Sequence, residues 1–123
     1  FREEWVRGGK KTVKLKLRGH VLLIPKQALP ENQRVLVRIS LSVPGVLMVT
    51  LDPDGLEFAE SHPASLTLSY EDADLKGVPP HELAIYREMN AGGWECLGGR
   101  VEPGERQVTV DLAHFSRYAL ASR

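Results

Sequence analysis

The chain has 123 residues, a mass of 13.7 kDa, 42% hydrophobic and 26% charged residues, and a formal net charge of zero. These values are typical of one globular domain with its own core, and the single Cys96 excludes an internal disulfide and a cysteine-based metal site. The longest uninterrupted apolar runs have four residues, whereas a membrane-spanning helix needs about 20, so we expect no membrane partner.

In the first half of the chain, hydrophobic residues recur at every second position, as in half-buried β-strands. Between residues 12 and 18, valine and leucine alternate with lysine and arginine, which predicts a strand with a basic outer face. Further strands are expected over 21–24, 33–41 and 46–51, with a break at 43–45. Asp52-Pro53-Asp54-Gly55 predicts a tight turn, because proline presets φ, aspartate accepts backbone hydrogen bonds and glycine tolerates positive φ.

The second half of the chain continues the pattern of short strands. Strands are expected over 56–58, 64–70, 82–87, 94–97, 107–112 and 117–121, with a short extended piece around Val101. Residues 71–81 form the longest loop, and residues 90–93 a hairpin turn. No window shows the periodicity of a helix. About ten short strands separated by turn signals predict an all-β fold, an antiparallel β-sandwich.

Five segments, taken in order, resemble a ZU5 domain. They are Val21-Leu22-Leu23-Ile24-Pro25-Lys26-Gln27-Ala28-Leu29-Pro30, residues 52–58, residues 83–86, residues 92–95 and the terminal His114-Phe115-Ser116-Arg117-Tyr118-Ala119. The first and the last are the most specific. The resemblance runs from about residue 10 to residue 121, so we assign residues 10–123 to the domain and residues 1–9 to an N-terminal extension or linker.

The resemblance implies a β-sandwich module that binds other protein domains and has no catalytic activity. Similar modules occur in cytoskeletal adaptors, netrin-receptor tails, tight-junction scaffolds and death-signalling proteins, and also in bacterial multidomain proteins. A second β-domain often follows in animal proteins, which makes an adjacent domain of the same chain an expected partner. Because the sequence begins at Phe1 rather than Met, we expect it to be part of a longer polypeptide. A subset of the family carries His-Phe-Ser and cleaves itself between Phe and Ser.

The residues of this terminal motif suggest the same chemistry. The Ser116 hydroxyl follows the Phe115 carbonyl directly, so in a bent backbone Ser116 Oγ can attack that carbonyl in an N→O acyl shift, with His114 as the nearest assisting base. In a straight strand His114 and Ser116 would share a face about 6.6 Å apart, so a bulge or bend is needed. In the structural alternative, Phe115 and Tyr118 pack in the core, Ser116 makes a hydrogen bond and His114 caps an edge.

Charge is divided along the chain. Residues 1–38 carry ten Lys or Arg against three Glu, and residues 39–123 carry six against thirteen Asp or Glu. One interpretation is a basic face that binds an acidic protein surface, formed by Lys10, Lys14, Lys16 and Arg18. The other is that the two halves interleave and balance locally. The sequence has no recognition helix or aromatic stacking motif, so we expect no nucleic-acid partner.

The remaining polar residues predict no metal or cofactor. His20, His62 and His81 lack a metal-ligand spacing and are expected as solvated loop residues. The acidic cluster around residues 71–74 lacks the glycine and terminal glutamate of a calcium loop. Cys96 is expected as a half-buried strand residue, and Trp5 as a core residue or an exposed contact.

The sequence therefore predicts a non-catalytic interaction or structural module of a larger protein. Self-cleavage at Phe115–Ser116, with the two fragments staying associated, is the alternative. It would be a single-turnover reaction without an external substrate.

Overall fold

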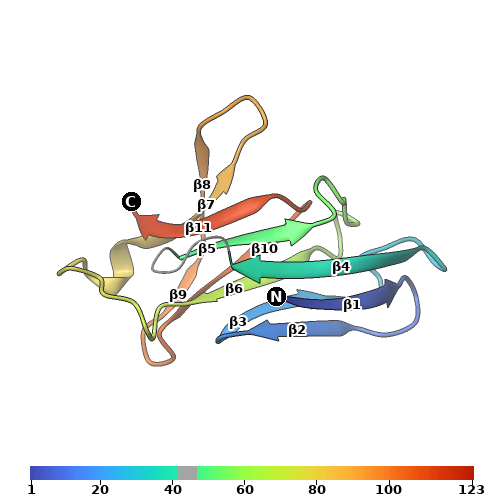
Figure 1. Cartoon of the computed structure of the whole chain (residues 1–123), viewed down its shortest axis with the longest axis horizontal. Helices are drawn as coiled ribbons and strands as arrows, with labels where there is room; N and C mark the ends of the chain where they lie inside the picture. The colour runs from blue at the N-terminus through green and yellow to red at the C-terminus, as the bar shows by residue number, and fades with distance from the viewer. Residues whose placement is uncertain (42–46) are drawn as a thin grey trace.

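The computed structural model describes residues 1–41 and 47–123 and shows two antiparallel sheets packed face to face (Figure 1). The six-stranded sheet has the order β1-β4-β5-β11-β7-β8, and the five-stranded sheet has the order β2-β3-β6-β10-β9. The strands are β1 (Arg2–Arg7), β2 (Val13–Leu17), β3 (His20–Ile24), β4 (Arg34–Leu41), β5 (Met48–Asp52), β6 (Ala64–Ser69), β7 (Leu83–Glu88), β8 (Trp94–Gly98), β9 (Arg100–Glu102), β10 (Gln107–Leu112) and β11 (Arg117–Ser122). A 3₁₀ turn, Pro80–Glu82, precedes β7. The expected all-β sandwich is confirmed.

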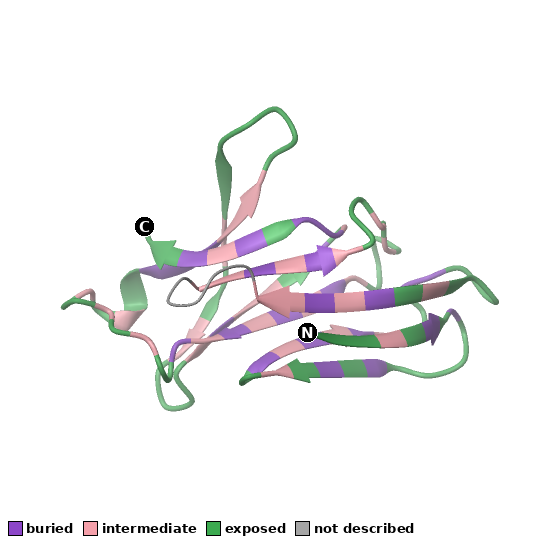
Figure 2. Ribbon diagram, viewed as in Figure 1, coloured by how far each residue is buried: buried purple, intermediate pink, exposed green. Residues whose placement is uncertain are grey.

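The alternating sequence pattern explains how the core forms. Along β2, Val13 and Leu15 are buried while Lys14 and Lys16 are exposed, and Figure 2 shows the same alternation along the other central strands. One row of each sheet therefore faces the other sheet, and these rows fill the space between them. The fully buried aliphatic residues include Leu22, Ile24, Val37, Ile39, Val49, Leu51, Leu66, Leu68, Ile85 and Val108.

Residues 2–7 form β1 at the edge of the six-stranded sheet, inside the segment that the sequence analysis places before the domain. The strand pairs antiparallel with β4, with Trp5 opposite Leu36. Its sequence gave no clear signal because polar residues occur in both of its rows and only Val6 is buried. Trp5 is 54% exposed, so it is a surface residue rather than a core residue.

Two further sequence expectations differ from the structure. Residues 56–58 form no strand, and Glu57 makes only an isolated bridge with His114. Cys96 is exposed rather than half-buried, because it lies on β8, in the hairpin of β7 and β8 that extends beyond the other strands in Figure 1. The break expected at 43–45 lies outside the described residues.

The chain changes sheets between β10 and β11. β10 lies in the five-stranded sheet beside β6, and β11 lies in the six-stranded sheet between β5 and β7. The four residues Ala113–Ser116 therefore carry the chain across the end of the core, and this crossing contains the His-Phe-Ser motif.

Gly8 joins the β1–β2 turn to the loop before β4. Its N–H donates to the Gln33 carbonyl at 2.9 Å, and its carbonyl accepts the Asn32 N–H at 3.0 Å. A Cβ at this position would lie 2.0 Å from the Pro30 oxygen, and backbone atoms cannot rotate away.

We expect Gly8→Ala to lower the free energy of unfolding by about 2–3 kcal/mol, because the added methyl group overpacks against backbone. Gly104→Ala is the matched control, since its Cβ would meet nothing within 4 Å, and we expect a change within about 0.5 kcal/mol. Urea unfolding followed by tryptophan fluorescence measures both. Equal effects of the two substitutions would contradict the close packing at Gly8.

Candidate functional site at the sheet crossing

The three residues of the His-Phe-Ser motif are placed differently in the crossing. Phe115 points into the core, where it is 1% exposed and packs edge-to-face on Phe58 with ring centroids 5.0 Å apart. Ser116 is buried as well, at 8% exposure, and His114 is half-buried. The crossing thus has the aromatic anchor that the structural alternative requires, and it also keeps the serine out of bulk water.

Residues 51–58, which include the 52–55 turn, bond to the backbone of the crossing. The Phe115 N–H donates to the Leu56 carbonyl at 2.9 Å, and the Gly55 N–H donates to the Phe115 carbonyl at 3.0 Å. Two more bonds extend this ladder on either side, from the Phe58 N–H to Ala113 and from the Leu51 N–H to Ser116. Hydrogen bonds therefore hold the carbonyl of the Phe115–Ser116 peptide bond and also the carbonyl of the next one.

The side chains of His114 and Ser116 bond to different groups. Ser116 Oγ donates to the Glu88 carbonyl at 2.9 Å. His114 Nδ1 lies 3.2 Å from the Phe115 carbonyl oxygen, and His114 Nε2 bonds to the Arg87 guanidinium. Among the described residues, no hydrogen bond joins His114 to Ser116. The structure therefore brings both side chains to the same peptide bond, with the imidazole at the carbonyl oxygen.

Tyr118 fixes the carbonyl that precedes the motif. Its hydroxyl donates to the His114 carbonyl, and its ring is 1% exposed. Burial raises the pKa of Tyr118 well above its ordinary value of 10.0, so the hydroxyl remains a donor. This bond joins two residues four positions apart and so helps to fix the crossing.

A hollow of about 260 Å³ opens beside the Phe115–Ser116 bond. Its walls come from the 54–55 turn, the end of β7 with the following hairpin turn, and the motif itself. The hollow therefore leaves room for water next to this bond, although Phe115 and Ser116 are buried.

Sequence reasoning missed three contributors to the site, namely Gly55, Arg87 and Glu88. Gly55 and Glu88 act through backbone atoms, which leave no side-chain signal. Arg87 had a weak signal, since it lies in the strand row of Leu83 and Ile85, where a charged residue needs a partner.

The four proposed basic-face residues lie along one edge of the five-stranded sheet. Lys14 and Lys16 are exposed on the outer side of β2, while Lys10 and Arg18 lie in the turns at its two ends. None of the four makes an ion pair with a described residue. Lysines on an edge strand also discourage pairing with another chain. This structural role explains the basic residues on β2 without a bound ligand.

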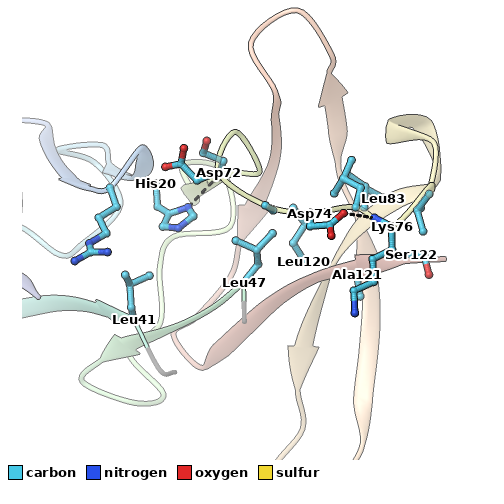
Figure 3. A pocket seen from close by; sticks show the side chains of 15 residues that line it. His20, Leu41, Leu47, Asp72, Asp74, Lys76, Leu83, Leu120, Ala121 and Ser122 are labelled. Carbon is cyan, nitrogen blue, oxygen red and sulfur yellow. Dashed lines mark hydrogen bonds between the residues drawn. The ribbon is translucent and has the colours of Figure 1, made fainter. Parts of the chain in front are cut away.

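A larger hollow of about 710 Å³ lies between the sheets under the 72–78 loop (Figure 3). Leu41, Leu47, Leu83 and Leu120 form its apolar side, and its polar residues have mixed charge, with Asp72 and Asp74 as well as Arg18 and Lys76. No group of His, Cys, Asp and Glu in the described part of the chain could hold a metal ion.

His20 corrects one sequence expectation, because it is 5% exposed rather than solvated. The Ser69 N–H donates to His20 Nδ1 at 3.0 Å. The turn at Gly19 begins β3 one residue earlier than expected, so that His20 starts the buried row of Leu22 and Ile24. His62 and His81 are exposed, as expected.

The comparisons with protein-family models and with curated proteins found no match for this chain. The ZU5 assignment therefore remains a prediction from the sequence motifs. No helix in the described part is long and apolar enough to cross a membrane.

Burial lowers the pKa of His20 from its ordinary 6.5, so the folded chain resists a proton that the unfolded chain accepts. This stabilisation is present above pH 6.5 and is lost as the pH falls toward the lowered pKa. We expect the free energy of unfolding to decrease between about pH 7 and pH 5, by at most about 1.4 kcal/mol per pH unit for one proton.

His20→Asn, which keeps an acceptor for the Ser69 N–H, should remove this part of the pH dependence. The control is His62→Asn, at an exposed histidine, which should retain it. Urea unfolding across the pH range measures all three proteins. An unchanged pH profile in His20→Asn would show that another group titrates.

Proposed function

We propose that the domain is an interaction module of a larger protein and binds another protein domain, such as its neighbour in the same chain. The observation that carries this proposal is the set of large apolar side chains left exposed on β1, on β4 and directly before β1. Phe1, Trp5 and Leu36 are 67%, 54% and 38% exposed. Exposed large aromatic side chains are enriched at protein interaction sites.

Two arginines hold the aromatic residues of this set in a defined arrangement. The Arg34 guanidinium lies 4.4 Å from the centre of the Trp5 ring, and Arg38 lies 4.1 Å from that of Phe1. Arg38 also donates to Glu3 at 2.9 Å. Trp and Arg are the residues most enriched among those that dominate binding energy, and side chains held in place lose less entropy on binding.

For binding to the adjacent domain of its own protein, we expect Trp5→Ala to weaken the affinity by about tenfold or more, as truncation of an interface anchor does. The matched control is Lys14→Ser with Lys16→Ser, on the other sheet, which should change it by less than about twofold. Isothermal titration calorimetry, with circular dichroism to confirm folding, measures both.

Loss of affinity in the lysine variant, with Trp5→Ala unchanged, would identify the basic face on β2 as the interface. In that case wild-type binding would also fall steeply with added salt. Full affinity in both variants would remove both surfaces from the proposal.

A second candidate function is self-cleavage at Phe115–Ser116, favoured by the environment of the Phe115 carbonyl oxygen. Gly55 N–H donates to this oxygen at 3.0 Å, and a His114 ring nitrogen lies 3.2 Å away. When a nucleophile adds to the carbonyl, the oxygen gains negative charge, and each preorganised donor to it contributes about 10²–10³ in rate.

The reaction would run in two balanced steps. Ser116 Oγ adds to the Phe115 carbonyl carbon, the bond from that carbon to the Ser116 nitrogen breaks, and the hydroxyl proton ends on the departing nitrogen. The product is an ester with a free amine. Water then adds to the ester carbon, the carbon–Oγ bond breaks, Phe115 leaves as a carboxylic acid and Ser116 regains its hydroxyl. The Oγ is already beside its target, which supplies the largest advantage.

We expect the folded wild-type protein to cleave during incubation. When it is then denatured, it should give two masses, residues 1–115 and 116–123. Ser116→Ala removes the nucleophile and should give one full-length mass. Ser122→Ala, at an exposed serine near the end of β11, should cleave like the wild type. Intact-mass spectrometry measures all three. A single full-length mass for the wild type would mean that the motif serves the crossing alone.

A further inference from the structure

Arg87 is a charged side chain that bonds directly to the His-Phe-Ser motif. It pairs across the sheet with Tyr118 on β11, whose ring is buried, so Arg87 points toward the core side. One guanidinium nitrogen, Nη2, lies 3.1 Å from Glu95 Oε1 on β8, and Nη1 bonds to His114 Nε2. The arginine is thus held between a carboxylate and the imidazole.

These contacts determine which His114 nitrogen carries the proton. A guanidinium can only donate, so Nε2 must offer its lone pair to Arg87. A backbone carbonyl can only accept, so Nδ1 must donate to the Phe115 oxygen. Both contacts require the same neutral tautomer, with the proton on Nδ1. The partner of one ring nitrogen commonly sets the tautomer of a histidine in this way.

We propose that Arg87 is a positioning residue that holds His114 as the Nδ1–H tautomer, so that His114 donates a hydrogen bond to the Phe115 carbonyl instead of serving as the base for Ser116. This inference rests on the self-cleavage proposed above. It replaces the base role that the sequence suggested for His114, because neither ring nitrogen has a lone pair free to accept the serine proton.

The end of β7 then addresses both sides of the same peptide bond. On the carbonyl side, the Arg87 side chain bonds to His114, which lies at the Phe115 oxygen. On the serine side, the Glu88 carbonyl accepts the hydrogen bond of the Ser116 hydroxyl. The Glu88 carboxylate also pairs with Arg117, the residue that follows Ser116. The Phe115 oxygen, which becomes charged in the reaction, thus has two donors, the Gly55 N–H and His114 Nδ1–H. The nucleophile, Ser116 Oγ, has one acceptor, the Glu88 carbonyl.

The direct test is the tautomer of His114, measured by long-range ¹H–¹⁵N NMR in the uncleavable Ser116→Ala protein at mildly alkaline pH. We expect a protonated Nδ1 and an unprotonated Nε2. Adding Arg87→Met should shift the ring toward the Nε2–H form, and Arg87→Lys, which keeps a donor, should restore the Nδ1–H form at least in part. An Nε2–H ring in the Ser116→Ala protein, or an unchanged Nδ1–H ring with Arg87→Met, would overturn the proposal.

Cleavage rates separate a donor from a base. Asparagine can donate a hydrogen bond but cannot act as a base, so His114→Asn should keep a rate within about tenfold of the wild type, while His114→Ala should lose about 10²–10³. Arg87→Met should lose about 10–100-fold, as changes to a supporting group do. Equal losses in His114→Asn and His114→Ala would restore the base role and overturn the donor role.

The two proposals fail in different ways. If the wild type cleaves while NMR shows the Nε2–H ring, self-cleavage stands and the role of Arg87 is wrong. If the wild type never cleaves, self-cleavage is wrong, and the role of Arg87 in positioning His114 for cleavage is overturned with it whatever the tautomer.

Discussion

The structure depends on one short crossing, in which the chain leaves the five-stranded sheet after Leu112 and enters the six-stranded sheet at Arg117. A crossing through the end of a core must give a partner to each backbone polar group that it removes from water. Here residues 51–58 bond to Ala113, Phe115 and Ser116, the Tyr118 hydroxyl bonds to the His114 carbonyl, and Phe115 packs on Phe58. The turn before residue 56 and the end of β7 are placed beside the motif as a result, so the same contacts that close the sandwich also build the candidate site.

The sequence predicted the fold where one face of a strand is buried. The alternation through Val35, Val37 and Ile39 identified β4 because only one of its rows meets the core. The same logic failed for β1, where both rows contain charged residues. It also failed for Cys96, because a hairpin that extends past the opposite sheet has no core on either face.

The candidate site was predictable only in part, because its decisive contacts come from residues distant in sequence. The motif itself indicated which bond to consider. Its partners depend on strand register, which places Arg87 opposite Tyr118 and so beside the crossing. The chain bends at Ala113, before the motif, and the imidazole lies at the carbonyl oxygen rather than at the hydroxyl. Residue spacing alone does not distinguish these two arrangements, because both put the ring within reach of the bond.

The position of β11 in the sheet determines how the end of the chain resists a pulling force. β11 pairs with β5 on one side and with β7 on the other, antiparallel to both. A pull on the end of the chain would load both rows of hydrogen bonds in shear, so the whole length of the strand resists at once. If β11 were withdrawn, the six-stranded sheet would split in two, and β5 and β7 would each present an unpaired edge to any other strand nearby.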